Sequence, residues 1–180
     1  MRHLKTLAII IAGLWRCMNV CATTENYPDA ASGYTDNGLL WTYTKDSFSA
    51  HLYIDGDGEM DNYSSTSLSP WAQYLKYVSN IVIGEGITTI GDYAFYMGDY
   101  PDKLKNISIP TTVMSIGQGA FSQTCSTVPL VVIPEGVTTI GANAFNNIGS
   151  RNNNRATVVL PSTLRTIGDH AFHCTNGTEN

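Results

Sequence analysis

Two clusters in the sequence contain residue types that commonly hold metal ions. The run from Asp55 to Asp61 places a carboxylate at every second position, as a calcium-binding loop does. An EF-hand loop needs a glycine where this run has Met60, and a glutamate where its twelfth position is Thr66. We therefore interpret the run as a glycine-rich turn that follows a strand, and we expect no calcium there.

The second cluster, Asp169, His170, His173 and Cys174, combines side chains that zinc prefers. Nucleophilic catalysis has less support, because no serine stands in a Gly-x-Ser-x-Gly turn. The acidic residues of the N-terminal segment are scattered and do not form an acid–base group. An enzyme is therefore the last of three functional alternatives. Whether the histidines form a site depends on the elements that position them.

Those elements are internal repeats. Four blocks of fifteen residues align without a gap, and their starts are separated by 26, 24 and 27 residues. Such a period indicates a solenoid, in which each coil buries its apolar side chains against its neighbours. The blocks are IVIGEGITTIGDYAF from Ile81, ISIPTTVMSIGQGAF from Ile107, VVIPEGVTTIGANAF from Val131 and VVLPSTLRTIGDHAF from Val158.

Every block has the same parts in the same order. It opens with two apolar residues at alternate positions, such as Ile81 and Ile83, which predict a short strand with one buried face. A second apolar pair, spaced by three, and the final Ala-Phe predict ladders of isoleucine and phenylalanine in a shared core. Between the second apolar pair and the final Ala-Phe, one position holds a glycine in each block. We expect a backbone turn there that a Cβ atom would obstruct. These glycines are Gly91, Gly117, Gly141 and Gly168.

The repeats also place the histidines and cysteines. His170 and His173 occupy slots that the other blocks fill with varied residues, so we expect both to face solvent and to bind no metal. Cys125 and Cys174 belong to the second and fourth coils, which puts their Cα atoms roughly 9–10 Å apart, beyond the reach of a disulfide. We interpret them as two partly buried free thiols.

The block resembles the BspA-type leucine-rich repeat in its I-x-I-P, T-x-I-G and A-F elements. The resemblance covers Ile81 to Phe172 and extends upstream through Gly38 to Tyr63. It implies a mainly β, right-handed leucine-rich-repeat solenoid of four coils over residues 81–180. It also implies a secreted or cell-surface protein that adheres to host or microbial proteins or matrix, with no catalytic residue and no cofactor.

The chain before the repeats divides into three parts. Residues 1–22 have the basic start, short apolar run and small-residue end of a secretory signal peptide, with cleavage expected after Ala22. The apolar run is roughly half a bilayer span, so we expect no membrane span after cleavage. Residues 23–37 are expected to be a disordered linker, and residues 38–80 an N-terminal cap.

The cap is predicted to contain a β-hairpin and a short helix. Alternating residues in Leu40–Tyr43 and Ala50–Ile54 predict two strands joined by a polar turn. Ser69 and Pro70 are predicted to start the helix, with serine as the N-cap. One face of the helix packs against the cap or the first coil; it contains Trp71, Tyr74, Leu75 and Val78.

The outward face of the block strands is the first candidate binding site. An exposed, partly apolar stripe often marks an interaction surface, although β-branched residues also suit strands for structural reasons. The connectors Tyr96–Asn106 and Asn146–Thr157 are the second candidate, because loops on rigid scaffolds carry function. The predicted stripe consists of Asn80, Val82, Asn106, Ser108, Leu130, Val132, Thr157 and Val159.

Charge limits the partners. Without residues 1–22 the chain keeps seven basic and fifteen acidic residues, a formal net charge of −8. Such a protein repels phosphate backbones, so we expect extracellular proteins or glycans as partners and no nucleic acid. The alternative to adhesion is a truncated or structural fragment of a larger repeat protein, which self-associates as a homodimer through an uncapped C-terminal coil.

Overall fold

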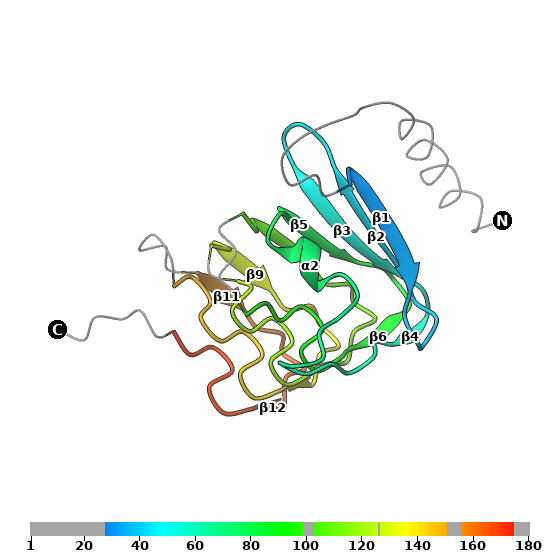
Figure 1. Ribbon diagram of the computed structural model, residues 1–180. Coiled ribbons are helices and arrows are strands. Elements are labelled where there is room, and N and C mark those ends of the chain that lie inside the picture. The colour runs from blue at the N-terminus through cyan, green and yellow to red at the C-terminus, as the bar shows by residue number, and fades with distance from the viewer. Residues whose placement is uncertain (1–27, 99–102, 126, 151–155, 175–180) are drawn as a thin grey trace.

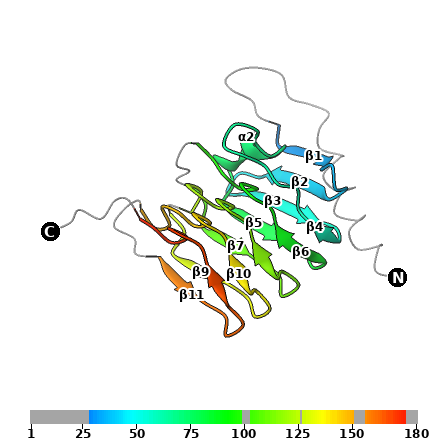
Figure 2. The same ribbon diagram turned by 90° about the horizontal axis from the view of Figure 1, so that it is seen from below.

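The computed structural model describes residues 28–98, 103–125, 127–150 and 156–174. The expected signal peptide, residues 1–22, therefore lies outside the described residues. The described chain is mainly β and contains one short helix, with two sheets on either side of a shared core (Figure 1). Figure 2 shows the strands of successive coils stacked in chain order, as in the predicted solenoid.

The first sheet, called here the front sheet, joins the cap to the coils. Its strands follow in the order β1 (Ala30–Tyr34), β2 (Leu40–Lys45), β3 (Ala50–Asp55), β5 (Asn80–Ile83) and β7 (Asn106–Ser108). β9 (Leu130–Val132) and β11 (Thr157–Val159) pair in parallel with each other as a separate two-stranded sheet. Because β9 lies beside β7, we count both strands with the front sheet. Pairing is antiparallel among β1, β2 and β3, and parallel from β3 to β5 and β7.

The second sheet, called here the back sheet, is wholly parallel. Its strands are β4 (Gly58–Glu59), β6 (Ile87–Ile90), β8 (Ser115–Ile116), β10 (Thr139–Ile140) and β12 (Thr166–Ile167). Each of the four coils therefore contributes one strand to each sheet. The first apolar residue of each block lies in a front-sheet strand, as predicted. The last residue of each second apolar pair lies in a back-sheet strand, and these back-sheet strands were not predicted.

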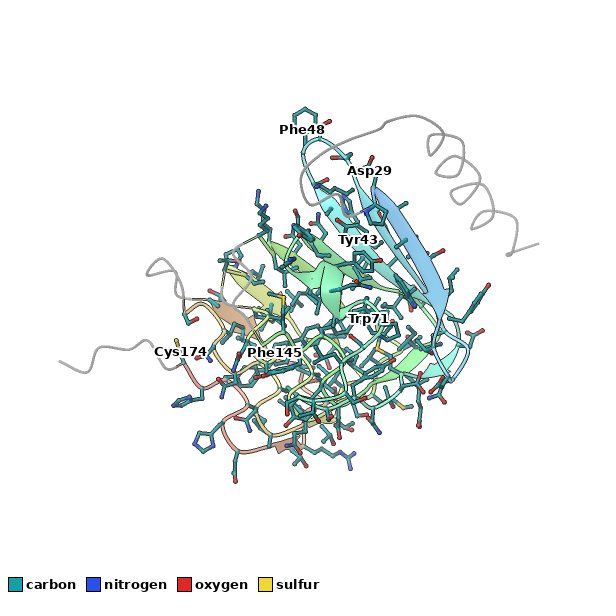
Figure 3. All side chains as sticks on the ribbon, viewed as in Figure 1. Asp29, Tyr43, Phe48, Trp71, Phe145 and Cys174 are labelled. Carbon is teal, nitrogen blue, oxygen red and sulfur yellow. The ribbon has the colours of Figure 1, made fainter. Side chains whose placement is uncertain are left out.

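Phenylalanine rings stack through the core from coil to coil, as predicted. The ring centroids of Phe95 and Phe121 are 4.9 Å apart, those of Phe121 and Phe145 are 5.1 Å apart, and those of Phe145 and Phe172 are 5.5 Å apart. Interplanar angles of 5°, 11° and 8° show that all four rings are nearly parallel. In the first three coils the rings of the ladder are fully buried. Phe145, the third of them, is labelled in Figure 3.

The repeated glycine is required by the neighbouring coil. A Cβ atom on Gly141 would lie 2.5 Å from the backbone nitrogen of Gln118, and one on Gly168 would lie 2.3 Å from that of Ala142. The predicted obstruction is confirmed, but the four glycines do not have positive φ angles. The left-handed turn comes two residues later, at Tyr93, Gly119, Asn143 and His170.

Part of the expected linker is a strand, which corrects the disorder predicted for residues 23–37. All five residues of β1 pair with β2, from Ala30 opposite Thr44 to Tyr34 opposite Leu40. A Cβ atom on Gly33 would lie 2.8 Å from Trp41 Nε1, so this glycine makes room for the indole ring. β1 contains no large apolar residue before Tyr34, and its sequence therefore shows no alternation.

The predicted hairpin is confirmed, and its second strand also belongs to the solenoid. β3 pairs antiparallel with β2 and parallel with β5, with Ile54 opposite Ile83. The next strand, β4, pairs in parallel with β6. Residues 50–59 therefore form a partial coil ahead of the four aligned blocks, and the cap and the solenoid share both sheets.

The helix, α2 (Ala72–Leu75), packs beneath the front sheet. Its predicted face is confirmed, since Trp71, Tyr74, Leu75 and Val78 are buried. Trp71 Nε1 donates a hydrogen bond to the carbonyl oxygen of Ala94 at 2.8 Å, and its ring lies 5.8 Å from that of Phe95. The prediction that Ser69 is the N-cap was wrong. Trp71 is the N-cap and makes no side-chain hydrogen bond there. Ser69 is buried, and its carbonyl oxygen, not its hydroxyl, accepts from Ala72 N.

Candidate binding face

All eight residues of the predicted stripe lie on the front sheet, on the side opposite the core. They alternate along each strand with core residues such as Ile81 and Val131, which are fully buried. Leu130, Val132 and Val159 are 48%, 49% and 47% exposed, and they are neighbours on one face. Asn80 and Val82 are half-buried, and Asn106, Ser108 and Thr157 are exposed. Their part in binding stays a prediction.

Strand register arranges the outward residues in two rows and extends the stripe onto the cap. The first row contains Thr44, His51, Asn80 and Asn106, and the second contains Thr42, Tyr53, Val82 and Ser108. By their places in the repeat, Leu130 and Thr157 continue the first row, and Val132 and Val159 continue the second. The four cap residues were not predicted, because the sequence of β3 indicates only a hairpin strand. The buried alternation of Leu52 and Ile54 was the signal that could have revealed them.

The cap end of the two rows is polar and aromatic but uncharged. The rings of His51 and Tyr53 stack with centroids 5.9 Å apart and an interplanar angle of 18°. Asn106 Nδ2 donates to Asn80 Oδ1 at 2.8 Å, and His51 Nε2 shares a hydrogen bond of 2.9 Å with Ser49 Oγ. Neither row contains Asp, Glu, Lys or Arg, although the chain has 25 such residues.

The repeat geometry agrees with comparison to known families. A family model described as the BspA type leucine rich repeat region matches residues 66–180 in six copies. The chain belongs to the BspA-type leucine-rich repeat family. The matched range includes helix α2 and all four coils, so the family is shown for most of the described chain.

One solved leucine-rich repeat protein shares the fold of this BspA-type chain, and two further structures match with lower TM-scores. A protein from Eubacterium ventriosum is 24% identical, with a TM-score of 0.56 over 77% of this chain and 40% of that protein. A T. pallidum leucine-rich repeat protein is 19% identical (TM-score 0.47, 84% of this chain and 69% of that one). A leucine-rich cell surface protein from Faecalibacterium prausnitzii is 20% identical (TM-score 0.29, 83% and 53%). No relative was found among curated protein sequences.

The two clusters considered as metal sites lie in different parts of the fold. Asp55 to Asp61 runs from the end of β3 through β4, with positive φ at Gly56 and Gly58, so the predicted glycine-rich turn is confirmed. His170 and His173 are exposed, with ring centroids 5.3 Å apart. Within the described ranges, no group of three or more His, Cys, Asp or Glu is arranged to hold a metal ion.

The two described cysteines are free thiols in different surroundings. Cys125 is buried, and the loss of solvent raises the pKa of its thiol well above the usual range. Cys174 is exposed near the end of the described chain (Figure 3), which corrects the expectation that both thiols are partly buried. Cys125 follows the phenylalanine of its block by four residues and Cys174 by two, so the thiols occupy different positions in the repeat.

The structure describes only part of each connector. Residues 99–102 of the connector Tyr96–Asn106 and residues 151–155 of the connector Asn146–Thr157 lie outside the described ranges. In the part of the chain that the structure describes, no helix is long and apolar enough to cross a membrane.

Proposed function

We propose that this chain is a secreted or cell-surface binding protein, which adheres to host or microbial proteins or matrix through the outward face of its front sheet. One observation carries the proposal: Leu130, Val132 and Val159 expose neighbouring apolar side chains on regular strands. A partner that covers them gains about 25 cal/mol for each Å² of apolar surface removed from water. Membership in the BspA-type family supports the same conclusion.

We infer binding without catalysis. Ser49 and His51 lie at the distance of a nucleophile and its base, but the nearby carboxylate of Asp46 accepts hydrogen bonds from Phe48 N and Ser49. A catalytic triad needs the acid on the far nitrogen of the histidine ring, where it orients the base. The arrangement instead holds the hairpin turn, and rigid strands then present the front face.

The test is binding of the purified full chain to a panel of extracellular matrix proteins, with Val132→Asp as the variant. We expect saturable binding of at least one protein by the parent chain. The variant should bind that protein at least about tenfold more weakly, because its carboxylate would lose water in an apolar interface. Surface plasmon resonance with the immobilised chain measures both affinities.

Thr139→Asp is the matched control. Thr139 is exposed on β10 of the same coil, and the substitution adds the same charge to the back sheet. Its affinity should equal that of the parent chain. Equal weakening by both substitutions would point to charge alone, and full binding by Val132→Asp would move the site away from the front sheet.

A second candidate function is self-association through the fourth coil. Leu160 and Ile167 are 45% and 48% exposed, whereas their counterparts in the third coil, Ile133 and Ile140, are buried. The edges of β11 and β12 also lie at the end of their sheets. We infer that a second copy of the chain covers this surface, since strand edges with apolar neighbours readily pair.

Ile167→Lys tests this second candidate. Sedimentation velocity should show a concentration-dependent dimer for the parent chain, and the variant should remain monomeric because the ammonium group cannot be buried without a partner. Thr139→Lys, on the same sheet but one coil earlier, should leave the dimer unchanged. A parent chain that is monomeric at every accessible concentration would remove this candidate.

A further inference from the structure

We propose that the cap end of the front sheet, centred on His51 and Tyr53, binds an uncharged glycan. The inference deepens the proposed function and rests on it, because it assigns a ligand class to one part of the same face. It depends on one juxtaposition: an aromatic pair lies beside an amide pair, in two rows that carry no charged side chain.

The aromatic pair supplies an apolar platform. His51 and Tyr53 project from β3 on the side opposite the buried Leu52 and Ile54. Their rings are nearly parallel, at 18°, with centroids 5.9 Å apart. One face of a pyranose ring presents only C–H groups, which pack well against aromatic rings. The tyrosine hydroxyl adds a donor and an acceptor at the edge of the platform.

The amide pair lies on the next two strands of the same row. Asn80 stands opposite His51, and Asn106 stands opposite Asn80. The 2.8 Å hydrogen bond from Asn106 Nδ2 to Asn80 Oδ1 orients both amides. In this orientation Asn80 presents its Nδ2 and Asn106 its Oδ1, so a donor and an acceptor stand side by side. Sugar hydroxyls both donate and accept, and neighbouring hydroxyls on one ring match such a pair.

The absence of charge selects the ligand class. In the strands β2, β3, β5 and β7 the two rows contain only threonine, serine, asparagine, histidine, tyrosine and valine. A sulfated or carboxylated polymer would meet no cation there, and it would approach a chain with a net charge of −5. The four strands span about 15 Å at the usual strand spacing, which fits a short oligosaccharide. A protein partner fits the other end of the face better, because Leu130, Val132 and Val159 are exposed there.

The test is binding of the purified full chain to panels of neutral and anionic polysaccharides, followed by calorimetric titration with oligosaccharides from each binder. We expect saturable binding of at least one neutral glycan, unchanged by high salt because no ion pair forms. Tyr53→Ala should weaken that binding about tenfold or more, as removal of an aromatic anchor does. Asn106→Ala, an exposed position where folding is not at risk, should also weaken it.

Tyr34→Ala is the control, because Tyr34 is an exposed tyrosine of β1 that lies in neither row. Its affinity should match that of the parent chain. Unchanged affinity in both Tyr53→Ala and Asn106→Ala would overturn the inference. So would a folded chain that binds no neutral glycan, or one that binds only anionic polymers in a salt-sensitive way.

The outcome is separable from that of the proposed function. Protein binding that Val132→Asp removes, in a chain that binds no neutral glycan, would leave adhesion standing and reject the glycan site. Glycan binding that Tyr53→Ala removes, in a chain that binds no protein, would support the glycan site and reject protein adhesion through the apolar end.

Discussion

We expect Gly141→Ala to lower the free energy of unfolding by about 3 kcal/mol, although it adds a single methyl group. The new Cβ atom would lie 2.5 Å from Gln118 N and 2.6 Å from the carbonyl carbon of Gly117. Both are backbone atoms, so no side-chain rotation relieves the contact. The third coil must move away from the second, which weakens the 2.8 Å hydrogen bond from Gly141 N to Ile116 O. Urea denaturation followed by circular dichroism measures the loss.

Gly98→Ala is the control for this prediction. Gly98 is exposed, and a Cβ atom there would meet no atom within 4 Å. Its φ angle is not positive, so alanine adopts the same backbone conformation. We expect a change within about 0.5 kcal/mol of zero. Equal losses for both substitutions would contradict the view that coil contact dictates the glycine slot.

The front strands were predictable because their pattern is local. Ile81 and Ile83 alternate with outward residues, and both face the core. The back sheet does not show this signal. In β6 the buried residues Ile87 and Ile90 flank two half-buried threonines. The buried side chains of this strand are therefore three residues apart, not two. Parallel pairing with the next coil, rather than alternation, defines these short strands.

The first strand of the cap depends on a contact that no local pattern contains. β1 reads Ala-Ala-Ser-Gly-Tyr, and its pairing with β2 places Gly33 beneath the Trp41 ring. The start of helix α2 was misassigned for a related reason. Ser69 has the residue type of an N-cap, but its hydroxyl is buried and neither donates nor accepts a hydrogen bond at the helix start. In both places tertiary packing overrides local preference.

The position of the candidate binding face was predictable, but its extent was not. Alternation in β5, β7, β9 and β11 identified the outward residues without reference to the rest of the fold. His51 and Tyr53 join them only because β3 pairs in parallel with β5, whose partner residues lie 29 positions further along the chain. A strand that is antiparallel to one neighbour and parallel to the other links the hairpin to the solenoid. That link produces one face with an apolar end on the coils and an aromatic, amide-rich end on the cap.

The phenylalanine ladder makes the second prediction with a large effect. We expect Phe121→Ala to lower the free energy of unfolding by about 4 kcal/mol. Phe121 is fully buried and stacks against Phe95 on one side and Phe145 on the other. Its removal leaves a cavity between rings that the coil hydrogen bonds hold apart, such as Phe95 N to Ala120 O and Phe121 N to Ala144 O. The site therefore cannot collapse, and urea denaturation should show a lower midpoint.

Phe172→Ala provides the comparison, because the same ring ends the ladder in the fourth coil. Phe172 is half-buried and stacks on Phe145 alone, with centroids 5.5 Å apart. Its loss should be less than half that of Phe121→Ala, since solvent replaces part of the ring without forming a closed cavity. Equal losses at the two positions would mean that the stack contributes evenly along the solenoid. The stability of each coil would then be independent of the coil that follows it, contrary to the nearest-neighbour coupling that repeat packing requires.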